Sequence, residues 1–188
     1  MRNIKYYLLL ALPLLVFIFV FNFPSPPWPD GLPYDAVARD LANNGIFRFF
    51  IWGDFDPSYL RVNFNNCIFY PLVHLFSFKV FNSTDSRILI FFNYFLLFCI
   101  TLNIRKIYKL ENKQLWILVL FAFNPLIYLY TNFQRPEFLM IFFLTSIWIL
   151  LDKKWYILSG IILALAAYTH QFAIFFVPPI IYAIWRRE

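Results

Sequence analysis

The distribution of apolar and charged residues along this chain predicts a helical membrane protein. Long runs without a charged residue are separated by short segments that carry nearly all of the charge. Inside a bilayer no water can satisfy backbone N–H and C=O groups, so each long run is expected to be helical. The predicted spans are 6–23, 88–104, 114–134, 136–151, 155–169 and 171–185. The predicted fold class is therefore all-α, a polytopic transmembrane bundle with about six spans that forms one membrane domain over residues 1–188.

The first and last spans need additional arguments. The first is followed by Pro24-Ser25-Pro26-Pro27 and not by a cleavage site of small residues, so an uncleaved signal anchor is predicted. The last two come from one run, 155–185, which is too long for a single ordinary span. We divide it at Thr169-His170-Gln171 and expect Pro178-Pro179 to kink the second half.

Residues 24–87 form the predicted outer loop, with two helices that lie along the membrane surface. In a helix over 33–44, Val37 and Leu41 fall on one side, whereas Asp35, Arg39 and Asn43 fall one turn apart on another. Gly45 is a plausible C-terminal stop for this amphipathic helix. The second helix, 67–81, is short and holds Pro71, His74 and Lys79, so it is expected to be interfacial or half-inserted.

Charge supports this topology. If 67–81 does not cross, one side of the membrane holds ten basic and three acidic residues, and the other holds six basic and seven acidic residues. If it does cross, only five of the sixteen basic residues lie on the side of the N-terminus. The positive-inside rule favours the first arrangement, with a cytoplasmic N-terminus in the plasma (inner) membrane. The net charge of +6 is explained by this asymmetry, and no nucleic-acid partner is expected.

Composition excludes several classes of protein. The chain is 62% hydrophobic and 14% charged, and a soluble domain of 188 residues could not bury that much apolar surface. Two cysteines give no disulfide framework, and no Cys/His cluster has zinc spacing. Asp54 and Asp56 form a lone Asp-x-Asp pair, which is weak support for a metal, so none is expected.

Five segments follow one another along the chain: Tyr-Asp-Ala-Val-Ala-Arg-Asp-Leu-Ala-Asn-Asn-Gly from Tyr34, Tyr-Pro-Leu-Val-His-Leu-Phe-Ser-Phe-Lys-Val-Phe from Tyr70, a basic turn at Arg105, Arg-Pro-Glu from Arg135, and Ala-Ala-Tyr-Thr-His-Gln from Ala166. In this order they resemble the front part of the GT-C glycosyltransferases, including the protein O-mannosyltransferases and the aminoarabinose transferases. These are integral-membrane enzymes that use polyprenyl- or dolichyl-phosphate sugars. The resemblance covers nearly all of the chain and is carried by order and spacing, because no single motif is specific.

The resemblance implies roles for particular residues. Asp35 takes the position of the first-loop carboxylate that acts as catalytic base, and Glu137 the position of the second acid, with Arg135 beside it. Members of this family often have paired prolines where this chain has the single Pro71, and most are longer. The chain is therefore expected to be the N-terminal part of a longer architecture.

Transfer from a polyprenyl phosphate requires a base for the acceptor hydroxyl, cations for the phosphate and a groove for the lipid tail. Arg135 is the best candidate phosphate clamp, because guanidinium binds phosphate in a bidentate manner. The other candidate substrate contacts are Arg39, Arg61, His74 and Lys79. A single displacement would invert the anomeric carbon. The expected partners are the lipid-linked hexose or pentose donor, membrane lipid and an unidentified glycan, lipid or protein acceptor, with no cofactor.

Simpler roles remain open for the same side chains. Asp35 could be a solvated carboxylate paired with Arg39, and Glu137 a helix-start anion paired with Arg135. His170 is more easily explained by an interfacial hydrogen bond than by catalysis. His74 and Lys79 could be snorkelling side chains or headgroup contacts.

A different class of function is also open, namely a non-catalytic multi-pass protein such as a lipid-carrier transporter or an assembly subunit. The predicted spans hold Asn93, Asn103 and Asn124 but no acid or base deep in the bilayer. Because ion-coupled transport usually needs such groups, this pattern counts against that form of transport.

Overall fold

The architecture is taken from a computed structural model, which describes residues 8, 32–45, 69–83, 85, 87–111, 114–122, 124, 126–127, 131 and 135–186. All regular secondary structure in these residues is helical, which confirms the all-α class for this part of the chain. The predicted first span, 6–23, lies outside the described residues except for Leu8. Residues 46–68 of the outer loop also lie outside them.

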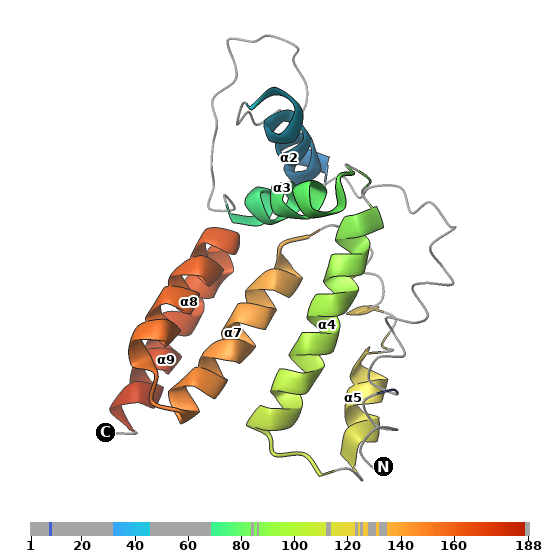
Figure 1. Ribbon diagram of the computed structural model, residues 1–188. Coiled ribbons are helices and arrows are strands. Elements are labelled where there is room, and N and C mark those ends of the chain that lie inside the picture. Colours follow the sequence, from blue (N-terminus) through green and yellow to red (C-terminus); the bar gives the residue numbers. More distant parts are fainter. Residues whose placement is uncertain are drawn as a thin grey trace.

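Three helices form the centre of the bundle. They are α4 (Arg87–Ile107), α7 (Glu137–Asp152) and α8 (Tyr156–Thr169), and α7 packs between the other two (Figure 1). After α8 the chain continues as a 3₁₀ helix, η3 (Gln171–Phe176), and then as α9 (Val177–Trp185).

Apolar side chains from these helices bury one another in a single cluster. Leu97 and Ile100 from α4, Ile147 and Leu151 from α7, and Ala166 from α8 are all within 1% of complete burial. Such dispersion contacts, together with polar contacts between helices, hold a helical bundle together whether water or lipid surrounds it.

Two more helices lie at the end of the bundle where α4 and α7 begin (Figure 1). Helix α3 (Phe69–Phe81) lies across this end, in contact with α4 and α8, and helix α2 (Leu32–Asn44) packs on α3. Ala38 of α2 is buried against Phe78 of α3 and Leu89 of α4. These helices match the predicted ranges 33–44 and 67–81 to within two residues.

Gly45 ends α2 as the sequence predicts. Its φ is +67°, in the left-handed region that glycine enters without a Cβ clash. Its N–H donates to the carbonyl of Leu41 at 3.2 Å, which satisfies one of the last carbonyls of the helix.

Among the described residues, one helix is both long enough and apolar enough to cross a membrane. This is α4, whose 21 residues extend about 32 Å, the thickness of a bilayer hydrocarbon core. Helices α7 and α8 have 16 and 14 residues and correspond to the predicted ranges 136–151 and 155–169, but each is shorter than an ordinary span.

The helix predicted over 114–134 is interrupted. Helix α5 (Leu115–Ala122) packs on α4 and stops before Asn124, which is not helical. A residue that precedes proline avoids the α conformation, and residue 125 is proline. The Asn124 side chain instead accepts a hydrogen bond from the N–H of Leu126 at 2.9 Å. The apolar run alone did not reveal this local break.

The predicted kink at Pro178-Pro179 takes a different form. The two prolines lie in the first turn of α9, directly after the 3₁₀ helix, so a new helix starts there. Proline is tolerated in a first turn because the N–H groups of that turn have no partner within the helix.

Candidate functional site

Most of the predicted site residues belong to one end of the molecule, which we call the α2–α3 end (Figure 1). It comprises helices α2 and α3, the start of α4 with Asp85 before it, the start of α7 with Arg135 and Glu137, and the junction of α8 with η3 at His170. A binding site at this end could draw on all of these elements.

Arg135 and Glu137 form an ion pair at the start of α7. Nη2 of Arg135 lies 2.6 Å from Oε1 of Glu137, and the two side chains are 26% and 23% exposed. Glu137 is the first residue of the helix, where the macrodipole favours a negative charge. Its second oxygen, Oε2, is buried and has no hydrogen-bond partner among the residues that the structure describes. This oxygen is an acceptor that a hydroxyl group could use.

His74 lies at the middle of α3 and is completely buried. Its ring centre is 4.2 Å from that of Tyr70 and 6.4 Å from that of Phe78. Within the described part of the chain neither ring nitrogen makes a hydrogen bond. Burial, and secondarily the positive charge of Arg39, lowers the pKa of His74 from 6.5 to about 3.

The histidine is therefore neutral at physiological pH. A neutral imidazole offers one N–H donor and one acceptor but no charge, so it suits a hydroxyl group better than a phosphate. The complete burial of His74 also does not fit the snorkelling role, in which the side chain would reach the headgroups.

Arg39 of α2 brings a cation against α3. Its guanidinium carbon lies 5.7 Å from the centre of the Phe78 ring, within the range of a cation–π contact. It also helps to lower the pKa of His74 and, as the smallest contribution, that of Asp85. The main cause of the lowered pKa of Asp85 is hydrogen bonding from Arg87. The backbone N–H of Arg87 donates to Oδ1 of Asp85 at 2.9 Å, and Nε of Arg87 donates to Oδ2 at 2.7 Å.

Asp35 belongs to the first turn of α2, one turn before Arg39. Its side chain lies outside the described part of the structure, so its predicted pairing with Arg39 and its role as base remain predictions. Lys79 is exposed in the last turn of α3. Arg61, Asp54 and Asp56 lie outside the described residues.

His170 makes a local hydrogen bond; that it lies at the membrane interface remains a prediction. Its Nδ1 accepts from the N–H of Phe172 at 3.3 Å and caps the 3₁₀ helix. The ring also packs on Phe172 at 4.8 Å between centres. These contacts give His170 a structural role at the junction of α8 and η3.

Two further polar side chains, those of Asn93 and Asp40, each have a buried oxygen atom. Asn93 in α4 is completely buried; its Nδ2 donates to the carbonyl of Thr131 at 3.1 Å, and its Oδ1 has no partner among the described residues. Oδ1 of Asp40 accepts a hydrogen bond from Nδ2 of Asn44 at 2.6 Å, and its Oδ2 atom is buried. The signal for Asn93 was present in the sequence, because it is one of two asparagines in the charge-free run 88–104.

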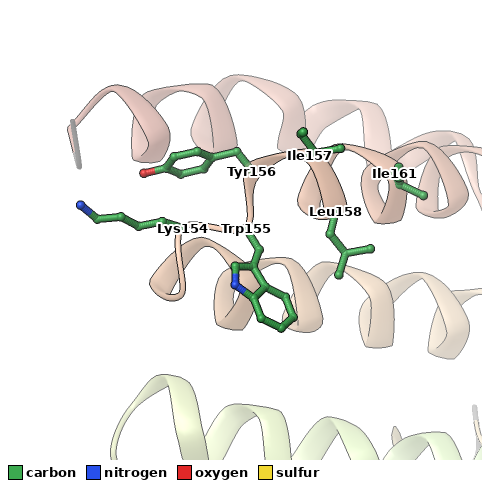
Figure 2. A pocket seen from close by; sticks show the side chains of 6 residues that line it. All are labelled: Lys154, Trp155, Tyr156, Ile157, Leu158 and Ile161. Atoms are coloured by element: carbon green, nitrogen blue, oxygen red, sulfur yellow. The ribbon is translucent and has the colours of Figure 1, made fainter.

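In the described part of the chain, no group of three or more His, Cys, Asp and Glu side chains could hold a metal ion. A shallow apolar hollow of about 520 Å³ lies at the start of α8, at the other end of the bundle (Figure 2). Because of this position, the hollow is not part of the α2–α3 end.

Comparison with known protein families, with curated proteins and with solved structures finds no match to this chain.

Proposed function

We propose that this protein is a glycosyltransferase, or its membrane module, which transfers a sugar from a polyprenyl-phosphate donor to an acceptor hydroxyl at the α2–α3 end. One observation carries the proposal: the partly buried Arg135–Glu137 pair, with a buried carboxylate oxygen still open to a donor, is at the same end as the helix that bears Asp35. The choice of a polyprenyl-phosphate sugar as the donor is based on the resemblance of the order of segments to the GT-C enzymes.

In this reaction the acceptor oxygen attacks the anomeric carbon of the donor sugar. The bond from that carbon to the phosphate oxygen breaks, and its electron pair leaves with the lipid phosphate. Asp35 takes the hydroxyl proton, and the anomeric carbon is inverted because there is a single displacement. Since the leaving group is already an anion, no acid is needed on the donor side.

The other groups bind and orient. Arg135 is assigned to the phosphate, held in place by its bond to Oε1 of Glu137, and Oε2 is assigned to a hydroxyl of the sugar or acceptor. His74 is assigned to a hydroxyl group because its ring is neutral. Its proposed role is therefore to hydrogen-bond a hydroxyl of the substrate and not to neutralise the phosphate. Arg39, Arg61 and Lys79 remain candidate phosphate contacts.

The distribution of side chains supports a multi-pass membrane placement. Large apolar groups face outward, among them Ile157 (85% exposed) and Phe175 (71%), whereas Asn93, Ser159 and Thr169 are buried. A soluble protein rarely exposes so many large apolar side chains, and polar groups in membrane bundles face the interior. In this placement α7, α8 and the η3–α9 segment accompany α4 through the bilayer, and the α2–α3 end faces outward.

The test is sugar transfer from a radiolabelled polyprenyl-phosphate sugar, measured in the protein's own membranes with the full native gene product. Asp35→Asn is expected to reduce transfer by about 100-fold or more, because a general base contributes at least that factor, while the protein level is unchanged. Asp40→Asn is the matched control on the same helix, since it keeps the acceptor oxygen that Asn44 uses.

Transfer that survives in Asp35→Asn would contradict the assignment of the base. A wild-type protein that is folded but transfers no sugar from any lipid-linked donor would contradict the proposal as a whole and would favour an assembly subunit.

A further inference from the structure

The turn between α7 and α8 holds two consecutive lysines, Lys153 and Lys154, and an apolar hollow lies beside the second of them (Figure 2). Lys154 lines the hollow itself, at the end opposite the α2–α3 end. The rest of the lining is aromatic or aliphatic and comes from the residue before α8 and from its first turns: Trp155, Tyr156, Ile157, Leu158 and Ile161. The hollow therefore has a positive charge at one edge, from Lys154, and an apolar wall along the start of α8.

The lysines are held by a well-defined turn. Three backbone hydrogen bonds close the end of α7, from the N–H groups of Lys153 and Trp155 to Leu150 and from that of Lys154 to Leu151, each at 3.0 Å. Lys154 has a φ of +59°, so the turn is a Schellman motif with lysine at the left-handed position. The backbone at both lysines is fixed in this way.

Trp155 positions the second cation. The Nζ atom of Lys153 lies 5.0 Å from the centre of the Trp155 ring, which is a cation–π contact. Trp155 is itself 53% exposed and lines the hollow, so Lys153 is kept close to the rim.

Charge at this end favours an anionic ligand. Among the described residues, the loops and helix ends here carry six basic residues, Arg105, Lys106, Lys109, Lys153, Lys154 and Arg186, against the two acids Glu111 and Asp152. The apolar wall requires the ligand to have a long hydrocarbon part, because Ile157 and Ile161 are 85% and 53% exposed on the outside of α8. A soluble anion such as inorganic phosphate would leave this wall uncovered.

We infer that the hollow is a binding site for an acidic phospholipid of the leaflet at this end. Lys153 and Lys154 contact the phosphate, and an acyl chain lies along Ile157, Leu158 and Ile161. The inference depends on the membrane placement proposed above but not on glycosyl transfer.

Native mass spectrometry of the full chain, released from detergent micelles with added phosphatidylglycerol or phosphatidylcholine, tests this site. The wild type is expected to retain phosphatidylglycerol in preference to phosphatidylcholine. The double variant Lys153→Gln/Lys154→Gln is expected to lose about tenfold or more of its phosphatidylglycerol affinity, because each basic residue near the headgroups contributes to the attraction. The double variant Ile157→Ala/Ile161→Ala should weaken binding of both lipids.

Lys106→Gln/Lys109→Gln is the matched control, since it removes two exposed lysines from the same end without altering the hollow. An equal loss in this control would show general charge attraction and overturn the site. Equal retention of both lipids by the wild type would also overturn it, as would displacement of phosphatidylglycerol by millimolar glycerol phosphate. None of these outcomes depends on the result for Asp35→Asn, so the two proposals can fail separately.

Discussion

His74 makes the stability of the α2–α3 end sensitive to pH. In the folded chain burial lowers the pKa of this side chain to about 3, against 6.5 for an unperturbed histidine. The unfolded chain therefore binds the additional proton first as the pH falls. We expect the free energy of unfolding to decrease between pH 6.5 and pH 3, by up to about 1.4 kcal/mol for each pH unit, as a linkage relation requires.

Unfolding in detergent, followed between pH 5 and pH 7, measures this slope in the wild type and in His74→Leu. The variant cannot gain the proton and should show a smaller slope. The only other histidine is His170, so His170→Gln is the control and should keep the slope of the wild type. The same slope in His74→Leu and in the wild type would contradict the account.

At the scale of residues, contacts between near neighbours could be predicted from the sequence, whereas burial could not. The pairing of Arg135 with Glu137 follows from their separation of two residues at a helix start, and it is observed at 2.6 Å. The burial of His74 depends on how α2 and the bundle pack around α3, which are contacts between distant segments. Nothing in the local pattern around His74 distinguishes a buried side chain from a headgroup contact.

At the scale of elements, charge-free runs located most helices. The charge-free runs 88–104, 138–151 and 155–169 correspond to α4, α7 and α8, because lipid and core packing both favour uninterrupted apolar helices. The prediction of one continuous helix over 114–134 was wrong, because Asn124 precedes a proline and such a residue avoids the α conformation. Hydropathy averages over a window and cannot detect such a break.

Polar contacts between helices offer a test of how α4 and α7 are held together. Nδ2 of Asn103 lies 3.1 Å from both Oγ1 of Thr145 and Oγ of Ser146. Asn103→Ala is expected to lower the free energy of unfolding by about 0.6–1.7 kcal/mol, the range for hydrogen bonds between membrane helices. Titration of the detergent-solubilised protein with SDS measures the change.

A double-mutant cycle gives the control for this contact. Replacement of both acceptors, Thr145→Val with Ser146→Ala, removes the partners of Asn103, so Asn103→Ala should then cost close to nothing further. An undiminished cost in that background would mean that Asn103 stabilises the protein by other means, and the interhelical contact would not be the cause.

At the scale of the whole molecule, the structure separates charge by end. The described residues at the α2–α3 end include four basic residues, Arg39, Lys79, Arg87 and Arg135, and four acidic ones, Asp35, Asp40, Asp85 and Glu137. The opposite end has six basic residues against two acidic ones. Among the described charged residues, each end therefore holds those that the predicted topology places on one side of the membrane.

This asymmetry predicts the sidedness of the protein in cells. In a background without Cys67 and Cys99, Ser83→Cys near the end of α3 should react with a membrane-impermeant maleimide added to intact cells. Lys153→Cys, after α7, should react only once the cells are permeabilised, because the positive-inside rule places the more basic end in the cytoplasm in the proposed topology. Each position is exposed and just outside a helix, so a difference in labelling reports the side of the membrane and not burial. Equal labelling of both positions in intact cells would rule out the proposed topology, and with it an outward-facing site at Asp35.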